Sequence, residues 1–159
     1  MPKPGPASDI VERTREIVAG HAGRLGPLLP ILHDVQHAFG HLPDEALRTV
    51  ADGLNLSRAE VHGVASFYHD FRDAPAGRHV LKICRAEACQ ASGGDAIAER
   101  AASRLKIAFG ETTADGAVTL EAVYCLGLCA CGPAAMIDGR VAGRLDDARL
   151  DALLAEAGQ

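Results

Sequence analysis

The sequence predicts an α+β protein in which a bundle of four short helices precedes a small mixed sheet packed with helices of its own. Three observations support this fold class. Apolar residues recur at helical spacing up to about residue 71, whereas two later runs have the composition of strands. Between them, residues 72–78 mix charge with proline and glycine, as linkers do. We therefore expect a helical domain over residues 8–74 and a second domain over residues 78–157.

The helical half contains four segments with an apolar stripe on one face. Gly40 is a natural stop for the second segment, and Ser57 with Glu60 forms a capping box at the start of the fourth. Short amphipathic helices joined by short loops make a compact bundle, for which a structural role is the simplest interpretation. The predicted helices span residues 9–20, 27–39, 42–54 and 57–71.

The second half changes its periodicity. Two β-like runs end at or next to a cysteine, and Asp138–Gly139 is a strong signal for a hairpin turn. The predicted order is a strand over 79–84, a helix over 93–109, a strand over 118–124, a hairpin over 134–142 and a final helix from Asp146. This order is that of a minimal thioredoxin-like layer, with helices against a small mixed sheet.

Composition excludes several classes of function. The formal charge of -5 provides no basic stripe for nucleic acid. The start of the chain has no apolar signal region, and the uncharged run Ala122–Ile137 is shorter than the roughly 20 residues that cross a bilayer. Five cysteines in such a chain are expected to be ligands or free thiols, because disulfide frameworks belong to small secreted domains. We expect a cytoplasmic protein without membrane insertion.

The cysteines fall into two groups on separate loops. Cys84 and Cys89 form a CxxxxC pair, and Cys125 and Cys129 form a CxxxC pair, with Cys131 two residues further on. Four thiolates favour an iron-sulfur cluster or zinc. If the two strands are neighbours in the sheet, their carboxyl ends bring the two loops together. Spacing alone leaves open whether Cys129 or Cys131 is the fourth ligand.

The residues around the cysteines suggest how the protein would set the reduction potential of such a centre. Glycines in or near the two loops let main-chain N–H groups approach sulfur, which favours the more reduced state of a cluster. Arg85 is a candidate positive charge beside the first ligand, unless it is a solvated surface side chain. The glycines concerned are Gly93, Gly94, Gly127, Gly132 and Gly139.

Other kinds of site fit the sequence less well than an iron-sulfur cluster does. Structural zinc usually takes CxxC-like pairs, and a disulfide oxidoreductase needs a CxxC motif that this chain lacks. His33-Asp-Val-Gln-His37 differs from the HExxH zinc signature by an aspartate in place of glutamate, so surface histidines are the simpler interpretation. No residue set for acyl transfer, hydride transfer or phosphate binding is evident, so we expect electron transfer without an active site of the chain's own.

Beyond the cysteine pairs, several short motifs resemble one protein family. Cys84-Arg-Ala-Glu-Ala-Cys89 and Cys125-Leu-Gly-Leu-Cys129 are preceded by three further runs, and together they resemble the thioredoxin-like [2Fe-2S] ferredoxins. The family includes the 24 kDa-type subunit of NADH dehydrogenase and the diaphorase subunit of NAD-linked hydrogenases. The three runs are Ile31-Leu-His-Asp-Val-Gln36, Phe39-Gly-His-Leu-Pro43 and Ser66-Phe-Tyr68.

The resemblance implies a helical bundle followed by a thioredoxin-like ferredoxin domain. It implies one [2Fe-2S] cluster held by Cys84, Cys89, Cys125 and Cys129, with Cys131 outside the four-cysteine pattern. It also implies a partner subunit that binds flavin and NAD.

The run Gly132–Leu145 and the short chain are most similar to the gamma subunit of NAD-dependent formate dehydrogenase, which adds a molybdenum-containing catalytic subunit as a partner. The equivalent subunit of an NADH-quinone oxidoreductase or of an NAD-linked hydrogenase is the alternative within the family, and a structural zinc domain is the alternative outside it.

Overall fold

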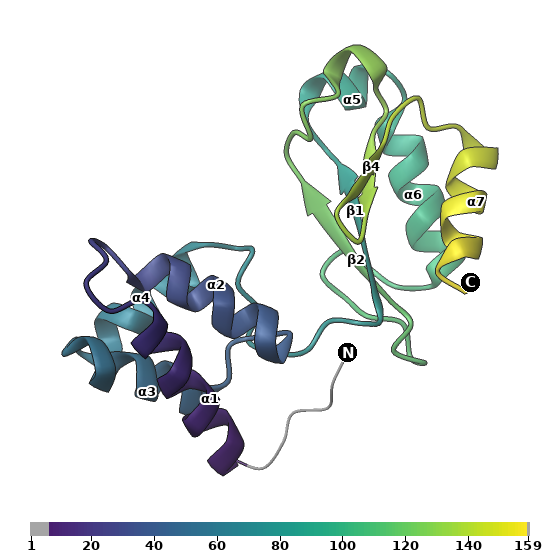
Figure 1. Cartoon of the computed structure of the whole chain (residues 1–159). Helices are drawn as coiled ribbons and strands as arrows, with labels where there is room; N and C mark the ends of the chain where they lie inside the picture. Colours follow the sequence, from purple (N-terminus) through teal and green to yellow (C-terminus); the bar gives the residue numbers. More distant parts are fainter. Residues whose placement is uncertain (1–6, 159) are drawn as a thin grey trace. The chain divides into compact units, whose positions relative to one another are not determined.

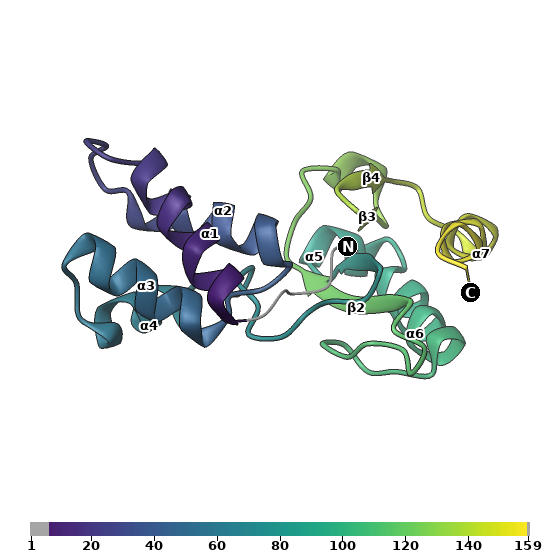
Figure 2. The same cartoon turned by 60° about the horizontal axis from the view of Figure 1, so that its bottom comes forward.

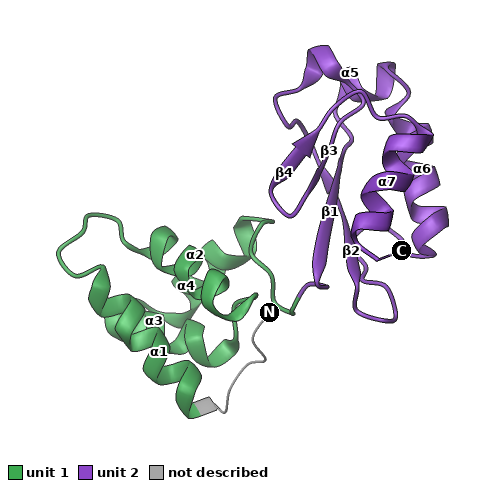
Figure 3. Ribbon diagram, turned by 45° about the vertical axis from the view of Figure 1, so that its right-hand side comes forward, with its two compact units in different colours: residues 1–75 green, residues 76–159 purple. Residues whose placement is uncertain are grey.

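A computed structural model describes residues 7–158, which form helices and a small sheet (Figure 1). The chain divides into two compact units, residues 1–75 and 76–159 (Figure 3). The boundary between them falls within the predicted linker. Each unit has its own apolar core.

Over the described part of the first unit, residues 7–75, the chain forms four helices, as predicted. Helix α1 packs against α2 and α3, and α4 packs against α3 (Figure 2). Buried aliphatic side chains such as Ile31, Val35, Val50 and Val61 fill the space between them. The helices are α1 (Ala7–Gly20), α2 (Leu28–Phe39), α3 (Asp44–Leu54) and α4 (Arg58–Phe67).

Local sequence explains where most of these helices begin and end. Gly40 ends α2 in the left-handed conformation, with φ of 79°. The predicted capping box is present at α4, where the Glu60 N–H donates to Ser57 Oγ and the Ser57 N–H donates to Glu60 Oε2. The fourth helix is shorter than expected, because Tyr68 adopts an extended conformation directly after Phe67.

The second unit is built on a four-stranded mixed sheet with the order β2-β1-β3-β4. The β1–β2 pair is parallel, whereas β1–β3 and β3–β4 are antiparallel. This confirms the predicted α+β class with a small mixed sheet. The elements are β1 (His79–Cys84), α5 (Glu87–Ala91), α6 (Gly94–Leu105), β2 (Val118–Val123), the 3-10 turn η1 (Cys129–Cys131), β3 (Ala135–Ile137), β4 (Arg140–Ala142) and α7 (Asp147–Glu156).

Helices α6 and α7 lie on the same side of the sheet (Figures 1 and 3). Leu81 and Ile83 of β1 are fully buried in the core that these helices share with the sheet. Cys84 belongs instead to a separate small cluster with Cys89 and Ala134. Because side chains alternate along a strand, β1 turns Leu81 and Ile83 to the helices and its final cysteine to the other side.

Two features differ from the sequence prediction. The expected helix over 93–109 ends at Leu105, because Lys106 takes a left-handed conformation with φ of 56°. The short helix α5 was not expected at all, since five residues are too few to show a helical period. No helix within residues 7–158 has the length and apolar character needed to cross a membrane.

Candidate metal centre

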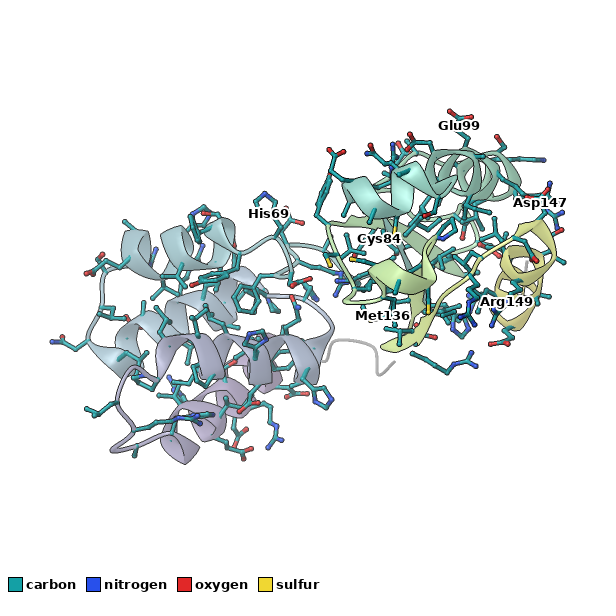
Figure 4. All side chains as sticks on the ribbon, turned by 90° about the horizontal axis from the view of Figure 1, so that it is seen from above. His69, Cys84, Glu99, Met136, Asp147 and Arg149 are labelled. Carbon is teal, nitrogen blue, oxygen red and sulfur yellow. The ribbon has the colours of Figure 1, made fainter. Side chains whose placement is uncertain are left out.

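Two parallel strands bring the cysteine-bearing segments to one edge of the sheet. Cys84 is the last residue of β1 and lies in register with Val123, the last residue of β2. Cys125 lies only two residues after Val123 and is therefore close to Cys84 at the same edge of the sheet. Figure 4 shows Cys84 between α5 and the segment that follows β2. The expectation that the two strands are neighbours is thus correct, and we call residues 124–132 the cysteine loop.

The spacing of the Cys125 and Cys129 sulfurs suits a tetrahedral metal ion. The two Sγ atoms are 3.7 Å apart. Two thiolates bound at about 2.3 Å to one tetrahedral ion would lie about 3.8 Å apart. The tight turn between them is held by the Gly127 N–H, which donates to Cys125 Sγ over 3.4 Å. These two thiols can therefore share one metal ion without rearrangement of the loop.

Cys84 and Cys89 form a second pair, and this pair is buried. Each is 2% exposed, and their thiols are hydrogen-bonded to one another. The main chain of Cys84 is fixed from both sides, because its own N–H donates to Ala134 O and the next N–H, of Arg85, donates to Val123 O. Helix α5 then returns the chain so that Cys89 faces Cys84.

Main-chain N–H groups converge on the Cys84 sulfur. Burial opposes its ionisation, but hydrogen bonds from the N–H groups of Ala86, Leu126 and Cys125 and from the Cys89 thiol outweigh this and lower the pKa of Cys84. Burial, with Cys84 next to it, raises the pKa of Cys89. A thiolate at Cys84 is thus stabilised before any metal binds, and metal binding requires deprotonated thiols.

Electrostatic coupling links the two pairs. The Cys125 thiol raises the pKa of Cys129, and Cys84 contributes to the same shift. Within residues 7–158, however, no three histidine, cysteine, aspartate or glutamate side chains converge on a site for a single ion. In a [2Fe-2S] cluster each iron takes only two thiolates from the protein. An arrangement of the thiols in two pairs fits such a cluster.

Comparison with known proteins agrees with this geometry. The thioredoxin-like [2Fe-2S] ferredoxin family matches this chain over residues 14–158. The chain belongs to this family. Its cofactor is therefore the [2Fe-2S] cluster that the sequence led us to expect, and the thioredoxin-like class of the second unit is confirmed.

Two curated relatives of this ferredoxin are similar over most of their length. It is 35% identical over 131 residues to the NADP-reducing hydrogenase subunit HndA of Solidesulfovibrio fructosivorans, which covers 82% of this chain and 77% of that protein. It is 38% identical over 143 residues to a subunit of the NADH-quinone oxidoreductase of Rhizobium meliloti, which covers 90% of this chain and 85% of that protein.

A solved structure shares the fold of the ferredoxin. The crystal structure of an NAD+-reducing [NiFe]-hydrogenase in the air-oxidized state aligns with a TM-score of 0.73 and 31% identity. The alignment covers 83% of this chain but only 23% of the hydrogenase chain. This ferredoxin therefore corresponds to one part of a much longer polypeptide in that enzyme.

The fifth cysteine of the ferredoxin, Cys131, is partly buried at the end of the cysteine loop. The Cys131 carbonyl accepts a hydrogen bond from the Arg144 N–H over 2.5 Å. A Cβ atom placed on Gly143 would lie 3.0 Å from Cys131 Cβ, so the base of the Cys131 side chain packs against the segment between β4 and α7. The 3.7 Å separation of the Cys125 and Cys129 sulfurs favours Cys129 as the partner of Cys125, a choice that spacing could not decide.

Arg85 is neither a solvated side chain nor an isolated charge. Its Nη2 donates to Asp95 Oδ1 over 3.1 Å, and its guanidinium lies 5.3 Å from the centre of the Phe109 ring. Phe109 packs on the core beneath α6 and α7. The charge of Arg85 is therefore paired on the helix side of the sheet, while Cys84 belongs to the separate cluster with Cys89. This weakens the expectation that Arg85 favours reduction of the cluster.

The HDVQH segment has other partners in the structure. His33 stacks on Phe71 with ring centroids 4.9 Å apart, and Asp34 Oδ2 lies 2.7 Å from His21 Nε2. Aspartate at this position thus pairs with a histidine 13 residues earlier. The simpler interpretation as ordinary histidines is the better one.

Several residues that shape the site have little or no signal in the sequence. The N–H donors of Ala86 and Leu126 have no sequence signal, because any residue but proline supplies one. Gly94 had a partial signal in the Gly93–Gly94 doublet. A Cβ at Gly94 would lie 2.6 Å from Cys89 O, so this glycine lets α6 begin directly against the turn that carries Cys89.

Proposed function

We propose that this chain is an electron-transfer subunit of an NAD-linked oxidoreductase and that Cys84, Cys89, Cys125 and Cys129 hold its [2Fe-2S] cluster. The observation that carries the proposal is the arrangement of the thiols in two pairs at one sheet edge, with the Cys125 and Cys129 sulfurs 3.7 Å apart. The buried pair would bind one iron and the exposed pair the other. Cys131 would remain a free thiol.

The chain's own residues would bind and stabilise the centre. When bound, the cluster accepts one electron, which changes its total charge with four thiolates from about 2- to about 3-. N–H groups of Ala86, Cys125 and Leu126 would offset the growing negative charge at Cys84, and the Gly127 N–H would do so at Cys125. Leu126 and Leu128 would exclude water from the buried pair.

The partner in this proposal is a separate chain that binds flavin and NAD. Support comes from the two relatives named as subunits and from the hydrogenase chain, in which the equivalent of this ferredoxin is part of a longer polypeptide. Parts that are joined in one polypeptide of one protein, and are separate chains in another, are expected to associate closely. We propose a cytoplasmic location, because the five cysteines form no disulfide and are accounted for as four ligands and one free thiol.

We further propose that the parent complex is a soluble NAD-dependent formate dehydrogenase with a molybdenum-containing catalytic subunit. The similarity of the run Gly132–Leu145 to the gamma subunit of that enzyme supports this choice. The second candidate is the equivalent subunit of an NADH-quinone oxidoreductase or an NAD-reducing hydrogenase, which the names of the relatives favour.

The cofactor is tested on the purified chain. Anaerobically purified protein should be brown, contain two irons and two acid-labile sulfides per chain, and give a [2Fe-2S] paramagnetic signal after reduction. A colourless protein with stoichiometric zinc would reject the proposed ligand arrangement in favour of a structural metal domain.

The parent complex is tested by purification from the native host through a tag on this chain. Recovery of a flavin-containing chain and a molybdenum-containing chain, with formate-dependent reduction of NAD, is the expected result. Recovery of a nickel-containing hydrogenase or of a membrane-bound quinone reductase would support the second candidate and reject formate dehydrogenase.

A further inference from the structure

The chain between the two buried cysteines forms a turn whose main chain is held at both ends. The Arg85 N–H donates to Val123 O over 2.8 Å, which ties the start of the turn to the end of β2. The Ala86 carbonyl accepts hydrogen bonds from the N–H groups of Cys89 and Gln90, over 2.9 Å and 3.0 Å. These bonds fix the chain on either side of one peptide group, which joins Arg85 to Ala86.

The Arg85–Ala86 peptide group makes a hydrogen bond on each of its two sides. Its carbonyl, which belongs to Arg85, accepts from Gln90 Nε2 over 3.0 Å. Its N–H, which belongs to Ala86, donates to the Cys84 sulfur. The peptide bond is trans, so the carbonyl and the N–H point in opposite directions within one plane. The Gln90 side chain and the Cys84 sulfur therefore lie at the two ends of one hydrogen-bonded chain.

The Gln90 side chain acts on the part of the turn that the other contacts leave free to rotate. The Arg85 side chain pairs with Asp95 on α6, and this contact holds the position of residue 85. A peptide group can still rotate between two fixed Cα atoms, because the soft dihedral angles on its two sides can change together. The bond from Gln90 restrains this rotation, and it also polarises the peptide group, which strengthens donation by the N–H.

We propose that Gln90 is a positioning residue that favours reduction of the centre, because its side-chain amide holds the Arg85–Ala86 peptide group with the N–H directed at the Cys84 sulfur. This inference rests on the proposed function, in which Cys84 is a ligand. N–H groups that donate to a ligand sulfur stabilise the negative charge that reduction adds, and so raise the reduction potential. Gln90 is uncharged and acts through the peptide group.

A first test measures the reduction potential of the holoprotein. Gln90→Met removes the amide donor and keeps an uncharged side chain of similar length. The potential should fall, so that the ratio of oxidised to reduced protein at a fixed applied potential rises about threefold or more. The ratio is read from the paramagnetic signal of the reduced protein in a redox titration. Iron content is measured first, and Gln90→Leu takes the place of a Gln90→Met protein that does not hold two irons.

Ser92→Ala is the matched control, because it removes the same kind of bond from the end of the same turn. Ser92 Oγ donates to Ala88 O over 2.8 Å. The N–H on the other side of that peptide group belongs to Cys89, and it donates to the Ala86 carbonyl. Ser92→Ala should therefore leave the potential unchanged. Equal shifts in the two variants would show a merely structural role for both side chains and would overturn the proposal, as would an unchanged potential in Gln90→Met.

A second test detects the hydrogen bonds to sulfur directly. Exchange of N–H for N–D shifts the iron–cysteine stretching vibrations when these groups donate to the ligand sulfurs, and resonance Raman spectra in H2O and D2O record the shift. Wild type and Ser92→Ala should show equal shifts, and Gln90→Met a smaller one. Wild-type vibrations that do not respond to deuterium would overturn the proposal independently of any variant.

The proposed function and the role of Gln90 fail in different ways. A wild-type chain that holds no iron, or holds zinc instead, would reject the proposed function itself. A wild-type chain with two irons, in which Gln90→Met and Ser92→Ala have the same potential and the same deuterium shift, would reject only the role of Gln90.

Discussion

Cys125 has an unusual backbone conformation for a residue with a side chain. Its φ is 118°, in the region that favours glycine, and it lies directly after the exposed Tyr124. Strained conformations of this kind cost of the order of 1–3 kcal/mol and concentrate at functional sites. The strain turns the Cys125 thiol to within 3.7 Å of the Cys129 thiol. The conformation of Cys125 therefore lowers the stability of the metal-free folded protein, and metal binding can offset this cost.

Replacing single cysteines should separate the proposed ligands from the free thiol. We expect Cys125→Ser to lose most of its iron, because a serine hydroxyl is a poor replacement for a thiolate ligand. Cys131→Ser should retain two irons per chain, because the Cys129 sulfur, 3.7 Å from that of Cys125, is the proposed fourth ligand. Iron analysis with visible absorption tests both, and equal iron content in the two variants would contradict the assignment.

Gly94 should be sensitive to the smallest enlargement. In Gly94→Ala the new methyl group would lie 2.6 Å from Cys89 O and 2.8 Å from Cys89 C, which are main-chain atoms that cannot swing away. Overpacking of this kind costs about 1–3 kcal/mol, which exceeds the gain of up to about 1 kcal/mol from helix propensity. We expect a less stable protein that also loses its cluster faster.

Gly63→Ala is the matched control for this variant. Gly63 also lies within a helix, but a Cβ there meets no atom within 4 Å. This control should be more stable by about 0.5–1 kcal/mol, since alanine is the better helix former. Thermal unfolding and the rate of cluster loss are measured for both variants, and matching results would show that close contact at Gly94 is unimportant.

At the scale of elements, helices α6 and α7 are joined by an ion-pair network. Arg100 lies 2.7 Å from Asp151 and 3.3 Å from Asp147, and Arg104 lies 3.4 Å from Asp151. The hydrogen bond from Arg100 lowers the pKa of Asp151 despite partial burial. The network keeps α7 against α6 and so supports the helix layer beneath the sheet.

This network predicts a defined dependence of stability on pH. Because the folded-state pKa of Asp151 is lowered, its contribution is complete above the unfolded value of about 3.9 and is lost as the pH falls through the folded value. Asp151→Asn should be less stable than wild type at about pH 7, and the difference should shrink below about pH 4. Urea unfolding across this range checks it.

Asp147→Asn is the control, because the Asp147 side chain is 70% exposed and its ion pair contributes less. Comparing variants at each pH removes any loss of the cluster that is common to all of them. A constant difference between wild type and Asp151→Asn at every pH would contradict the prediction.

Most elements could be predicted from the sequence, because local patterns specify them. The capping box at Ser57, the stop at Gly40 and the Asp138–Gly139 turn all occur as expected. The errors in the predicted elements lie where contacts between residues far apart in the chain determine the structure. Lys106 ends α6 in a left-handed conformation that its residue type does not predict. Helix α5 forms where the Cys89 side chain contacts that of Cys84.

At the scale of the whole molecule, the two units have separate cores. The core of the first unit draws on residues 10–71, and the two clusters of the second draw on residues 81–157. All five cysteines lie in the second unit. This supports our proposal of two domains, over residues 8–74 and 78–157, of which only the second carries the metal centre.

The separation of cores predicts that residues 76–159 fold alone. We expect this fragment to bind two irons per chain and to show the same visible absorption as the full chain, because every proposed ligand and N–H donor lies within it. Circular dichroism and iron analysis test this. An unfolded or iron-free fragment would mean that the helical unit is needed to assemble the centre.

The sequence by itself determined the α+β class, the change of structure after residue 71 and the placement of cysteines at two strand ends. These features follow from periodicity, capping and turn residues, which act over a few positions. Only the tertiary structure decided that one thiol pair is buried and the other exposed, and that the sulfurs of Cys125 and Cys129 lie 3.7 Å apart. Those outcomes depend on the parallel pairing of β1 with β2 and on the packing of α5 and α6, contacts between residues far apart in the chain.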